Sequence, residues 1–365
     1  VALNRAVVGH LSRILARPLE VDQDPSLYGA LGAALALGAK KPCRREGTPL
    51  RSAADLLRPS PEERSLSYPP LEISLSRFPD FAGQEAYEFP APGDSGNQAV
   101  EIDLYEIPSP GSRPRVVLGL DIGSTSTKAV LAENGKVLAG FYTRTAGRPL
   151  PAVRALFQAM EDAAGRHGTG WEILGCAVTG SGRKFIGGLV GADLVLDEIS
   201  AQARAAIEIE PTVDTIIEIG GQDAKFTTLA GGSVTFSAMN TVCAAGTGSF
   251  IEEQARKLGC PLAEYANVAL GARAPLTSDR CTVFMERDLN HYLQQGYPTA
   301  EVLAAVLHSV CENYLAKVAV ESRVGKKVLF QGAPAKNRAL VAALESRLKK
   351  PLLVSRFCHL TGAWG

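Results

Sequence analysis

The sequence predicts an α/β fold made of two similar halves with a cleft between them. From residue 115, RVVLGLDIG, TKAVLAE and GKVLAGFYT form a three-stranded meander with a turn at Asn134-Gly135. From residue 215, TIIEIGG, QDAKFTTLA and SVTFSA repeat this pattern. Helical and strand segments follow each opening, and each layer must bury its apolar face on another. Two such openings therefore indicate a duplicated α/β architecture.

The remaining elements follow from apolar periodicity and glycine stops. Helices are predicted over about 150–166, from Gly182, over 198–209, over 249–259 and over 301–315, with strands at 172–180 and 328–331. His291 and His308 fall in helical patterns and are interpreted as helix residues, not ligands. Cys176 and Cys311 are predicted to lie in the core.

An internal repeat connects the two ends of the chain. Residues 1–32 align without gaps with residues 334–365, sharing Asn4 with Asn337 and Pro18 with Pro351. Each copy predicts a helix, a short strand after the proline, and a glycine that opens another helix.

This repeat sets the expected domain organisation. Residues 1–40 are expected to be the C-terminal tail of a preceding homologous domain, and residues 115–365 a second such domain that lacks its last helix. Residues 41–114 are rich in Pro, Ser and Gly, which predicts a linker with a possible small β element. Within it, 71–76 and 99–107 alternate in polarity and could pair as strands.

Composition excludes several classes of function. The chain has 38 basic and 38 acidic residues, so net charge gives no reason to expect nucleic acid or a membrane surface. It has no apolar run of about 18 residues and no secretory signal pattern, which predicts a cytoplasmic protein. Its seven scattered cysteines are expected to be thiols, some of them metal ligands, and no role is predicted for Cys43, Cys260 or Cys358.

Two glycine-bearing turns carry the pattern of a phosphate site. In LGLDIGSTSTKAVLA, Asp121 stands at the end of a predicted strand, and a turn of small residues with hydroxyl side chains follows. Turn N–H groups and hydroxyls bind phosphate oxygens, and a strand-end carboxylate can position hydrated Mg²⁺. In IIEIGGQDAKFTTL, Gly220 and Gly221 precede Asp223 much as Gly123 stands near Asp121. Two turns in two halves predict a grip on nucleotide phosphates, although a polar hairpin with a satisfied aspartate is the alternative for the first turn alone.

A third stretch, NTVCAAGTGSF, places a cysteine before another small turn. Gly246-Thr247-Gly248 would bring the backbone close to a phosphate, while Cys243 suits a different ligand. The segment that follows is predicted to be a helix, whose N-terminus stabilises a thiolate. A contact with phosphate and a separate ligand for the thiol are therefore expected in the same stretch.

These motifs together resemble a known family. DIGSTSTK, VTGSGR, EIGGQDAK, NTVCAAGTGSF and SDRCTVFMERD are similar to the motifs of the ATP-dependent activators of 2-hydroxyacyl-CoA dehydratases and of the ATPase subunits of benzoyl-CoA reductase. The resemblance covers about residues 116–365, and residues 1–40 match the end of a preceding copy. It implies a duplicated actin-like (ribonuclease H-like) ATPase domain with a nucleotide cleft between two halves, in the superfamily of acetate kinase, sugar kinases, Hsp70 and actin.

The resemblance also implies a set of site residues. Asp121 and Asp223 would be catalytic, with ATP or ADP and Mg²⁺ as cofactors. The nucleotide would be bound by Gly123, Ser124, Thr125, Ser126, Lys128, Gly220, Gly221, Gln222, Gly246, Thr247, Gly248, Gly332, Ala333 and Asn337. Gly332-Ala333-Pro334 departs from the Gly-Gly-Val usual in the small activators, which puts the details of adenine contact in doubt.

The family's cysteines imply a shared metal cluster. A 4Fe-4S cluster takes four thiolates, and one chain offers Cys243 and Cys281 in two separate motifs. In the family such a cluster bridges two subunits, which implies a homodimer with a twofold axis through the cluster. The alternative is that both cysteines are small buried apolar residues.

The function implied is that of an ATPase in which ATP binding and hydrolysis control the transfer of a low-potential electron. A ferredoxin or flavodoxin would supply the electron, and a dehydratase-type or reductase-type acyl-CoA enzyme, possibly fused in a longer polypeptide, would receive it. Two alternatives remain: a sugar or small-molecule kinase of the same superfamily, which needs no paired cysteines, and a nucleotide-binding regulatory module without redox activity.

Overall fold

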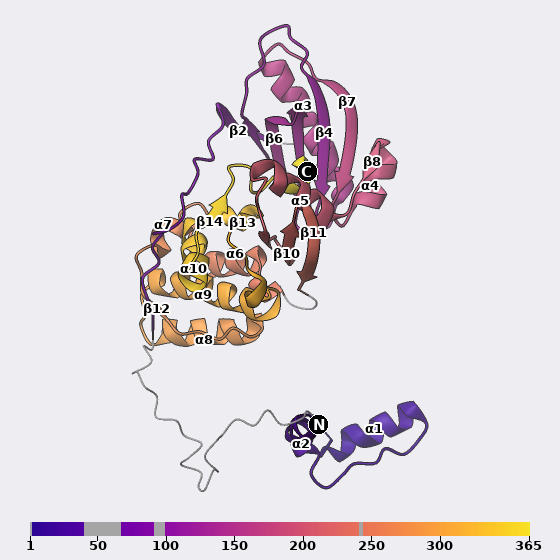
Figure 1. Ribbon diagram of the computed structural model, residues 1–365, viewed down its shortest axis with the longest axis vertical. Helices are drawn as coiled ribbons and strands as arrows, with labels where there is room; N and C mark the ends of the chain where they lie inside the picture. The colour runs from indigo at the N-terminus through magenta and orange to yellow at the C-terminus, as the bar shows by residue number, and fades with distance from the viewer. Residues whose placement is uncertain (1, 40–66, 91–98, 241–243) are drawn as a thin grey trace. The chain divides into compact units, whose positions relative to one another are not determined.

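The computed structural model describes residues 2–39, 67–90, 99–240 and 244–365 (Figure 1). The chain divides into two compact units, Val1–Arg64 and Ser65–Gly365, and each is described by itself.

The first unit repeats the helix ends of the second. In α1 (Arg5–Leu15) the Asn4 side chain accepts from two backbone N–H groups, and a left-handed residue, Ala16, closes the helix. In α10 (Arg338–Leu348) Asn337 caps the helix in the same way and Lys349 is left-handed. The sequence repeat therefore includes both caps, which are encoded locally.

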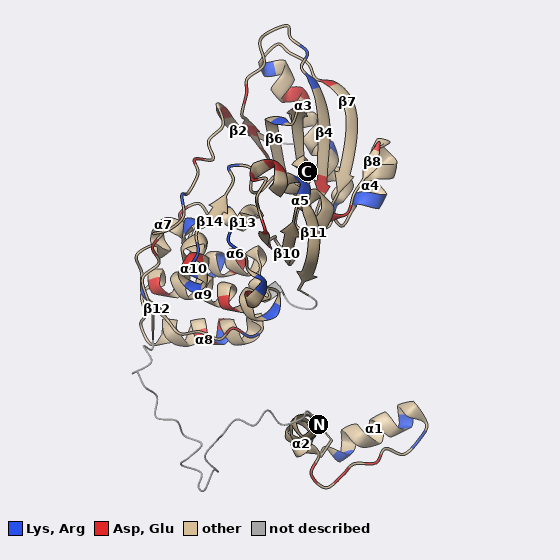
Figure 2. Ribbon diagram, in the orientation of Figure 1, with Lys and Arg blue, Asp and Glu red and all other residues tan. Residues whose placement is uncertain are grey.

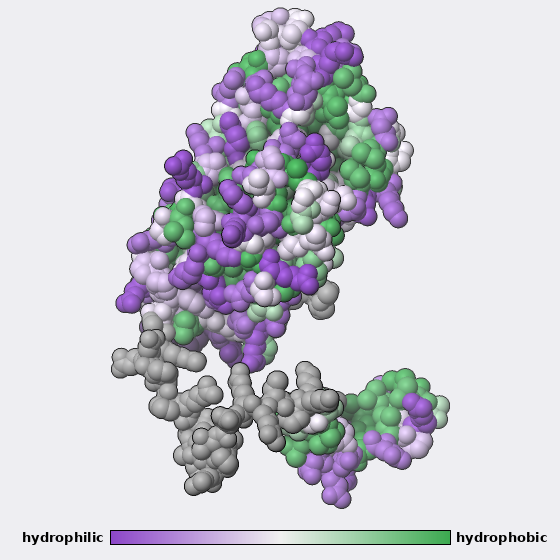
Figure 3. All heavy atoms as spheres, viewed as in Figure 1, coloured by the Kyte–Doolittle hydropathy of each residue, from purple (hydrophilic) through white to green (hydrophobic). Residues whose placement is uncertain are grey.

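The two copies differ in strand content and in burial. The strand predicted after the proline forms in the second copy as β14 (Leu352–Val354) but not in the first, where the 3₁₀ turn η1 (Pro25–Leu27) leads into α2 (Tyr28–Ala39). No described residue of 2–39 is buried, and apolar side chains cover much of these helices (Figure 3). The face of α10 from Ala339 to Leu344 is instead fully buried.

The first half of the larger unit is a seven-stranded sheet in the order β2-β3-β6-β5-β4-β7-β8. The predicted meander forms its antiparallel centre, and α3 packs on one face through an apolar core. Its elements are β2 (Glu85–Pro90), β3 (Ala99–Leu104), β4 (Arg115–Ile122), β5 (Ser126–Glu133), β6 (Lys136–Arg144), α3 (Pro149–Arg166), β7 (Glu172–Thr179), α4 (Arg183–Val190) and β8 (Leu194–Val195).

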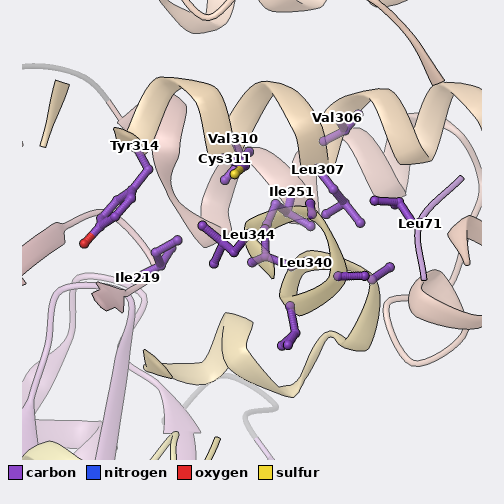
Figure 4. Packing of buried hydrophobic residues seen from close by; sticks show 14 of the residues in the cluster. Leu71, Ile219, Ile251, Val306, Leu307, Val310, Cys311, Tyr314, Leu340 and Leu344 are labelled. Carbon is purple, nitrogen blue, oxygen red and sulfur yellow. The ribbon is translucent and has the colours of Figure 1, made fainter. Parts of the chain in front are cut away.

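The second half is a five-stranded sheet in the order β11-β10-β9-β13-β14, with a helical layer around it. Helix α9 forms the centre of its core: Val306, Leu307 and Val310 face Ile251 and Leu344 (Figure 4). Its elements are β9 (Thr215–Ile219), β10 (Ala224–Ala230), β11 (Ser233–Met239), η3 (Ala244–Gly246), α6 (Gly248–Lys257), α7 (Tyr265–Ala269), β12 (Ala274–Pro275), α8 (Thr282–Gln294), α9 (Thr299–Lys317), η4 (Glu321–Arg323), β13 (Val328–Gln331) and η5 (Ala333–Lys336).

Two helices pack between the halves. α5 (Glu198–Ile209) leads from the first sheet to the second, and α11 (Thr361–Trp364) returns the chain to lie on α5 and on the first sheet. Gly365 packs so closely that a Cβ there would lie 1.8 Å from the carbonyl oxygen of Ala201. Basic and acidic residues are interspersed along both halves (Figure 2). None of the described helices is both long and apolar enough to cross a membrane.

The predicted pairing of 71–76 with 99–107 is wrong. Residues 71–76 form no strand, and β3 instead lies between β2 and β6, so that a hairpin extends the first sheet at its edge. The only upstream strand that reaches the second half is β1 (Ser67–Tyr68), which pairs with β12, as far as the described residues go. Alternation identified residues 99–104 as a strand, but it did not identify the partner, which is fixed by burial of Val100, Ile102 and Leu104 under α3.

Candidate nucleotide site

The two glycine turns are hairpin ends with the same construction. β4 and β5 pair so that Asp121 stands opposite Lys128, and the turn is closed by a hydrogen bond from the Gly123 N–H to the Ser126 carbonyl. The Lys128 Nζ lies 3.0 Å from the Asp121 Oδ2.

The second hairpin, between β9 and β10, has Glu218 opposite Lys225 and a turn closed from the Gly220 N–H to the Asp223 carbonyl. The Lys225 Nζ lies 3.1 Å from Glu218 Oε1 and 2.7 Å from Glu198 Oε2 on α5. The structural counterpart of Asp121 is therefore Glu218, and the equivalence drawn between Asp121 and Asp223 is wrong.

Hydrogen bonds hold the two turns together. The Ser124 hydroxyl donates to Gln222 Oε1 at 2.9 Å, which links the first turn directly to the second. The N–H groups of Gly248 and Ser249, in the first turn of α6, donate to the carbonyls of Gly220 and Gly221. The start of α6 is thus fixed to the second turn by its own backbone.

Close backbone approach explains two of the glycines. A Cβ on Gly221 would lie 2.6 Å from the Thr125 hydroxyl oxygen of the opposite turn. Gly332 has a φ of +98°, and a Cβ there would lie 2.0 Å from the carbonyl oxygen of Ile219. At both positions the absence of a side chain allows segments that are far apart in the sequence to lie in contact.

The charged groups between the hairpins are paired. Glu218 and Lys225 are buried, whereas Asp121 and Lys128 are partly buried. Burial lowers the pKa of Lys128, but the adjacent Asp121 carboxylate outweighs it and leaves the pKa raised. Burial likewise opposes protonation of Lys225, whose pKa is raised by Glu218 and Glu198. Burial raises the pKa of Glu218 above its usual range, with Lys225 acting in the opposite direction.

A cavity of about 510 Å³ extends from the hairpins toward α6, α7 and the loop after β13. A smaller pocket lies between the two turns themselves. Together they bring together most of the predicted nucleotide and catalytic residues: Asp121, Gly123, Ser124, Thr125, Ser126, Lys128, Gly220, Gly221, Gln222, Asp223, Gly248, Gly332, Ala333 and Asn337. Of the predicted set, Gly246 and Thr247 lie outside both linings: a Cβ on Gly246 would meet Asn313, and Thr247 is buried.

Several polar groups in the cavity are available to a ligand. Among the described residues, the Thr125 hydroxyl and the Gln202 Oε1 are buried without a hydrogen-bond partner. The turn N–H groups of Ser124, Thr125 and Gly221 likewise donate to no described backbone or side-chain acceptor. Buried side-chain polar atoms are normally satisfied. The Thr125 hydroxyl and the Gln202 Oε1, with the turn N–H groups beside them, therefore fit a polar ligand such as a phosphate chain with a hydrated cation.

Sequence reasoning missed several polar residues of this site, among them four that lie at the phosphate turns. Glu218 and Lys225 carry a signal, because Asp121/Lys128 and Glu218/Lys225 share a spacing of seven residues across a glycine turn. Glu198 and Gln202 lie on one face of α5 and line the smaller pocket, but no local motif marks them. The Gln202 Nε2 donates to Glu218 at 3.3 Å.

Of the two predicted metal ligands, Cys281 is described and Cys243 lies outside the described residues. Cys281 is partly exposed at the N-terminal end of α8, where its carbonyl accepts from Phe284 and Met285. The Asn313 side chain donates to the carbonyls of Asp279 and Arg280, just before Cys281, and packs on Gly246. The described residues contain no group of three or more His, Cys, Asp or Glu side chains that could hold a metal ion. Cys311 is buried as predicted, whereas Cys176 is only partly buried.

Two mixed sheets joined by crossing helices, with paired glycine hairpins facing a shared cavity, define an actin-like nucleotide-binding protein. The solved structures agree. Component A of the (R)-2-hydroxyglutaryl-CoA dehydratase from Acidaminococcus fermentans matches with a TM-score of 0.60 and 28% identity, covering 68% of this chain and 95% of that one. The activator of the 2-hydroxyisocaproyl-CoA dehydratase from Clostridium difficile, solved with bound ADPNP, matches with a TM-score of 0.60 and 30% identity, covering 68% and 91%.

The chain belongs to the BadF/BadG/BcrA/BcrD ATPase family, whose model matches residues 118–365. The (R)-2-hydroxyglutaryl-CoA dehydratase activating ATPase of Acidaminococcus fermentans is 32% identical over 256 residues, 68% of this chain and 94% of that protein. The activator of lactoyl-CoA dehydratase from Anaerotignum propionicum is 36% identical over 253 residues, again 68% and 94%. The family match begins at residue 118, so β1, β2 and β3 lie outside it.

Proposed function

We propose that this protein is an ATP-hydrolysing activator that delivers single electrons to a dehydratase-like or benzoyl-CoA reductase-like acyl-CoA enzyme. The observation that carries the proposal is the pair of matched hairpins, each with a carboxylate paired to a lysine beside a glycine turn. Membership of an ATPase family and the names of the related activators support it.

In this proposal ATP and Mg²⁺ are held between the hairpins. The turn N–H groups and the Thr125 hydroxyl would bind phosphate oxygens, Asp121 and Asp223 would hold the hydrated Mg²⁺, and Lys128 would offset negative charge. Glu218, with a pKa raised by burial, is suited to take a proton from the attacking water. Catalysis then consists mainly of positioning and charge stabilisation, with water as the phosphoryl acceptor.

Cys243 and Cys281 of two copies would hold a 4Fe-4S cluster. Cys281 fits this role because it is partly exposed and stands at the N-terminal end of a thirteen-residue helix, where free N–H groups favour a thiolate. When bound, the cluster supplies a one-electron carrier, charged by a reduced ferredoxin or flavodoxin.

The backbone offers a route from the nucleotide to the cysteines. The Gly220 and Gly221 carbonyls hold the first turn of α6, so that a shift of the second phosphate turn is transmitted to the segment after Cys243. Asn313 holds the residues before Cys281 and packs on Gly246, which ties the second cysteine to the same region. Movement at the phosphates would therefore reach both cysteine segments together.

Iron analysis under anaerobic conditions tests the proposal. We expect about four irons per two chains in the wild type, as a bridging 4Fe-4S cluster requires. Cys243→Ser and Cys281→Ser should each lose this iron and keep binding of a fluorescent ATP analogue. Cys260→Ser, a partly buried free cysteine outside the motifs, is the matched control and should keep it. Iron-free wild type that is folded, dimeric and nucleotide-binding would contradict the redox role and leave a kinase or a regulatory module.

A further inference from the structure

A segment that lies outside the family match crosses from one half of the actin-like domain to the other. We define the strap as residues 67–90, which run from β1 to β2 and are seen in Figure 1 as the violet trace between β12 and β2. The halves are already joined by α5 and by the return through β14 to α11. The strap is therefore a third connection across the cleft.

The first part of the strap is anchored in the second half. β1 pairs with β12, and the Tyr68 ring stacks on His308 of α9 with centroids 4.0 Å apart. Leu71 is 1% exposed and points at Val306 and Leu307 of α9 (Figure 4). Burial of one leucine side chain contributes about 2 kcal/mol, so this contact alone is a firm attachment.

The strongest anchor is the Glu345 carboxylate on α10, which is itself 2% exposed. It accepts from the N–H groups of Ser74, Leu75 and Ser76 at 2.7, 2.7 and 2.9 Å, and from the Ser74 hydroxyl at 3.0 Å. The Ser76 hydroxyl accepts in turn from the Leu352 N–H at 2.7 Å. A buried carboxylate can lose these donors only at a large cost, so 74–76 stays fixed to the second half.

The other end of the strap is built into the first half. The Gln84 N–H donates to the Leu104 carbonyl at 2.7 Å, and β2 then pairs with β3 along its whole length. β3 pairs with β6 of the central meander, and the Tyr87 hydroxyl donates to Asp162 on α3 at 2.9 Å. Residues 77–83 separate the two sets of contacts, and within them the Ala82 carbonyl accepts a hydrogen bond from the Arg356 side chain. Little of the strap is therefore without contacts.

The strap lies beside the lining of the cavity. Lys336 lines the cavity, and its ammonium group lies 5.8 Å from the centre of the Phe81 ring in the strap. Glu101, on the strand that pairs with β2, lines the cavity too. Arg144 of β6 forms a two-pronged ion pair with Glu252 of α6, and both of these residues also line the cavity. The strap therefore connects the two halves close to the walls of the cavity.

We propose that the strap limits the opening of the cleft and so slows the exchange of bound nucleotide. A motion that widens the cavity must extend the segment around Ala82 or release one anchor. The end in the second half is held by the buried Glu345 carboxylate, and the end in the first half is held by the pairing of β2 with β3 along its whole length. The effect on nucleotide exchange rests on the proposed function. The restraint on the cleft rests only on the contacts of the strap.

Lengthening the strap tests the inference without removing either anchor. A six-residue Gly-Ser insertion between Ala82 and Gly83 should raise the dissociation rate of a fluorescent ADP analogue by about fivefold or more, the lower end of coupling between linked sites. The same insertion between Gly231 and Gly232, in the exposed β10–β11 turn, is the matched control and should leave the rate unchanged.

Hydrogen exchange gives a second readout that does not need nucleotide. Amides of 123–125, 220–223 and the start of α6 should exchange faster in the Ala82–Gly83 variant than in the wild type and the control. Unchanged dissociation and unchanged exchange would overturn the proposal. If the wild type binds no nucleotide, the proposed function fails, and the exchange measurement alone decides for or against the strap.

Discussion

Lys225 is the cation on which the buried charges of the second hairpin depend. Its side chain is 7% exposed and that of Glu218 10%, and the two are 3.1 Å apart. Lys225→Met keeps the volume of the aliphatic chain and leaves the Glu218 carboxylate without a cation. Removing one partner of a buried ion pair costs about 3–5 kcal/mol. Because Glu198, the other partner, is 25% exposed and can be hydrated, we expect the lower value, about 3 kcal/mol at pH 7.

The pH dependence of this loss has a definite sign. The pKa of Glu218 is raised in the folded state, so the folded protein takes up a proton more readily than the unfolded chain. Without Lys225 the unpaired charge is removed when Glu218 is protonated, and the deficit of Lys225→Met should shrink as pH falls from 8 toward 5.5. In the wild type the contribution of Lys225, whose pKa is raised, is fully present below 10.5 and is lost only as pH rises through its folded pKa.

Urea unfolding of wild type and variants at both pH values measures these differences. The double variant Glu218→Gln, Lys225→Met removes both charges and should recover most of the stability lost in the single variant, since replacing both partners of a buried pair is often nearly neutral. A single-variant deficit below about 0.5 kcal/mol, the range of ordinary surface changes, would refute the reasoning. So would a deficit of the same size at pH 8 and pH 5.5.

Two further predictions concern Gly221 and Glu345. Gly221→Ala would place a Cβ 2.6 Å from the Thr125 hydroxyl oxygen. Overpacking of this kind costs about 1–3 kcal/mol, so the variant should bind a fluorescent ADP analogue about tenfold more weakly or worse. Gly188→Ala is the control because nothing lies within 4 Å of its new carbon, and equal affinities of the two variants would contradict the prediction. The pKa of Glu345 is lowered, because its hydrogen bonds to Ser76 and the adjacent N–H groups outweigh the effect of burial, so its stabilisation is present above 4.5 and is lost as pH falls. Glu345→Gln should therefore cost about 1–3 kcal/mol at pH 7 and progressively less below pH 4.5, and a thermal-unfolding difference that does not change with pH would exclude this role.

The sequence was informative where structure is encoded locally. The glycine turns and the helix from 198 to 209 follow from short-range chemistry, and the structure agrees. The phosphate turns also meet at one cavity, as two similar halves require.

What the sequence did not show depends on contacts between distant segments. Residues 71–76 alternate in polarity as a strand does, yet the N–H groups of 74–76 donate to the Glu345 carboxylate some 270 residues away. That acceptor gives the backbone another way to satisfy its donors, so no ladder is needed. Asp223 was matched with Asp121 because both stand near a glycine turn. The strand pairing shows the true counterpart, since Glu218 stands opposite Lys225 as Asp121 stands opposite Lys128.

The two hairpins share the same strand pairing, and the acids at the equivalent position differ in length by one carbon. Asp121 and Glu218 occupy the same position in the same pairing scheme, and each faces a lysine seven residues later. Glutamate is longer than aspartate by a single methylene group, so the acid on the second hairpin extends one carbon–carbon bond farther from its strand. The same strand pairing therefore presents two acids of unequal reach, and this difference makes the two matched hairpins chemically asymmetric.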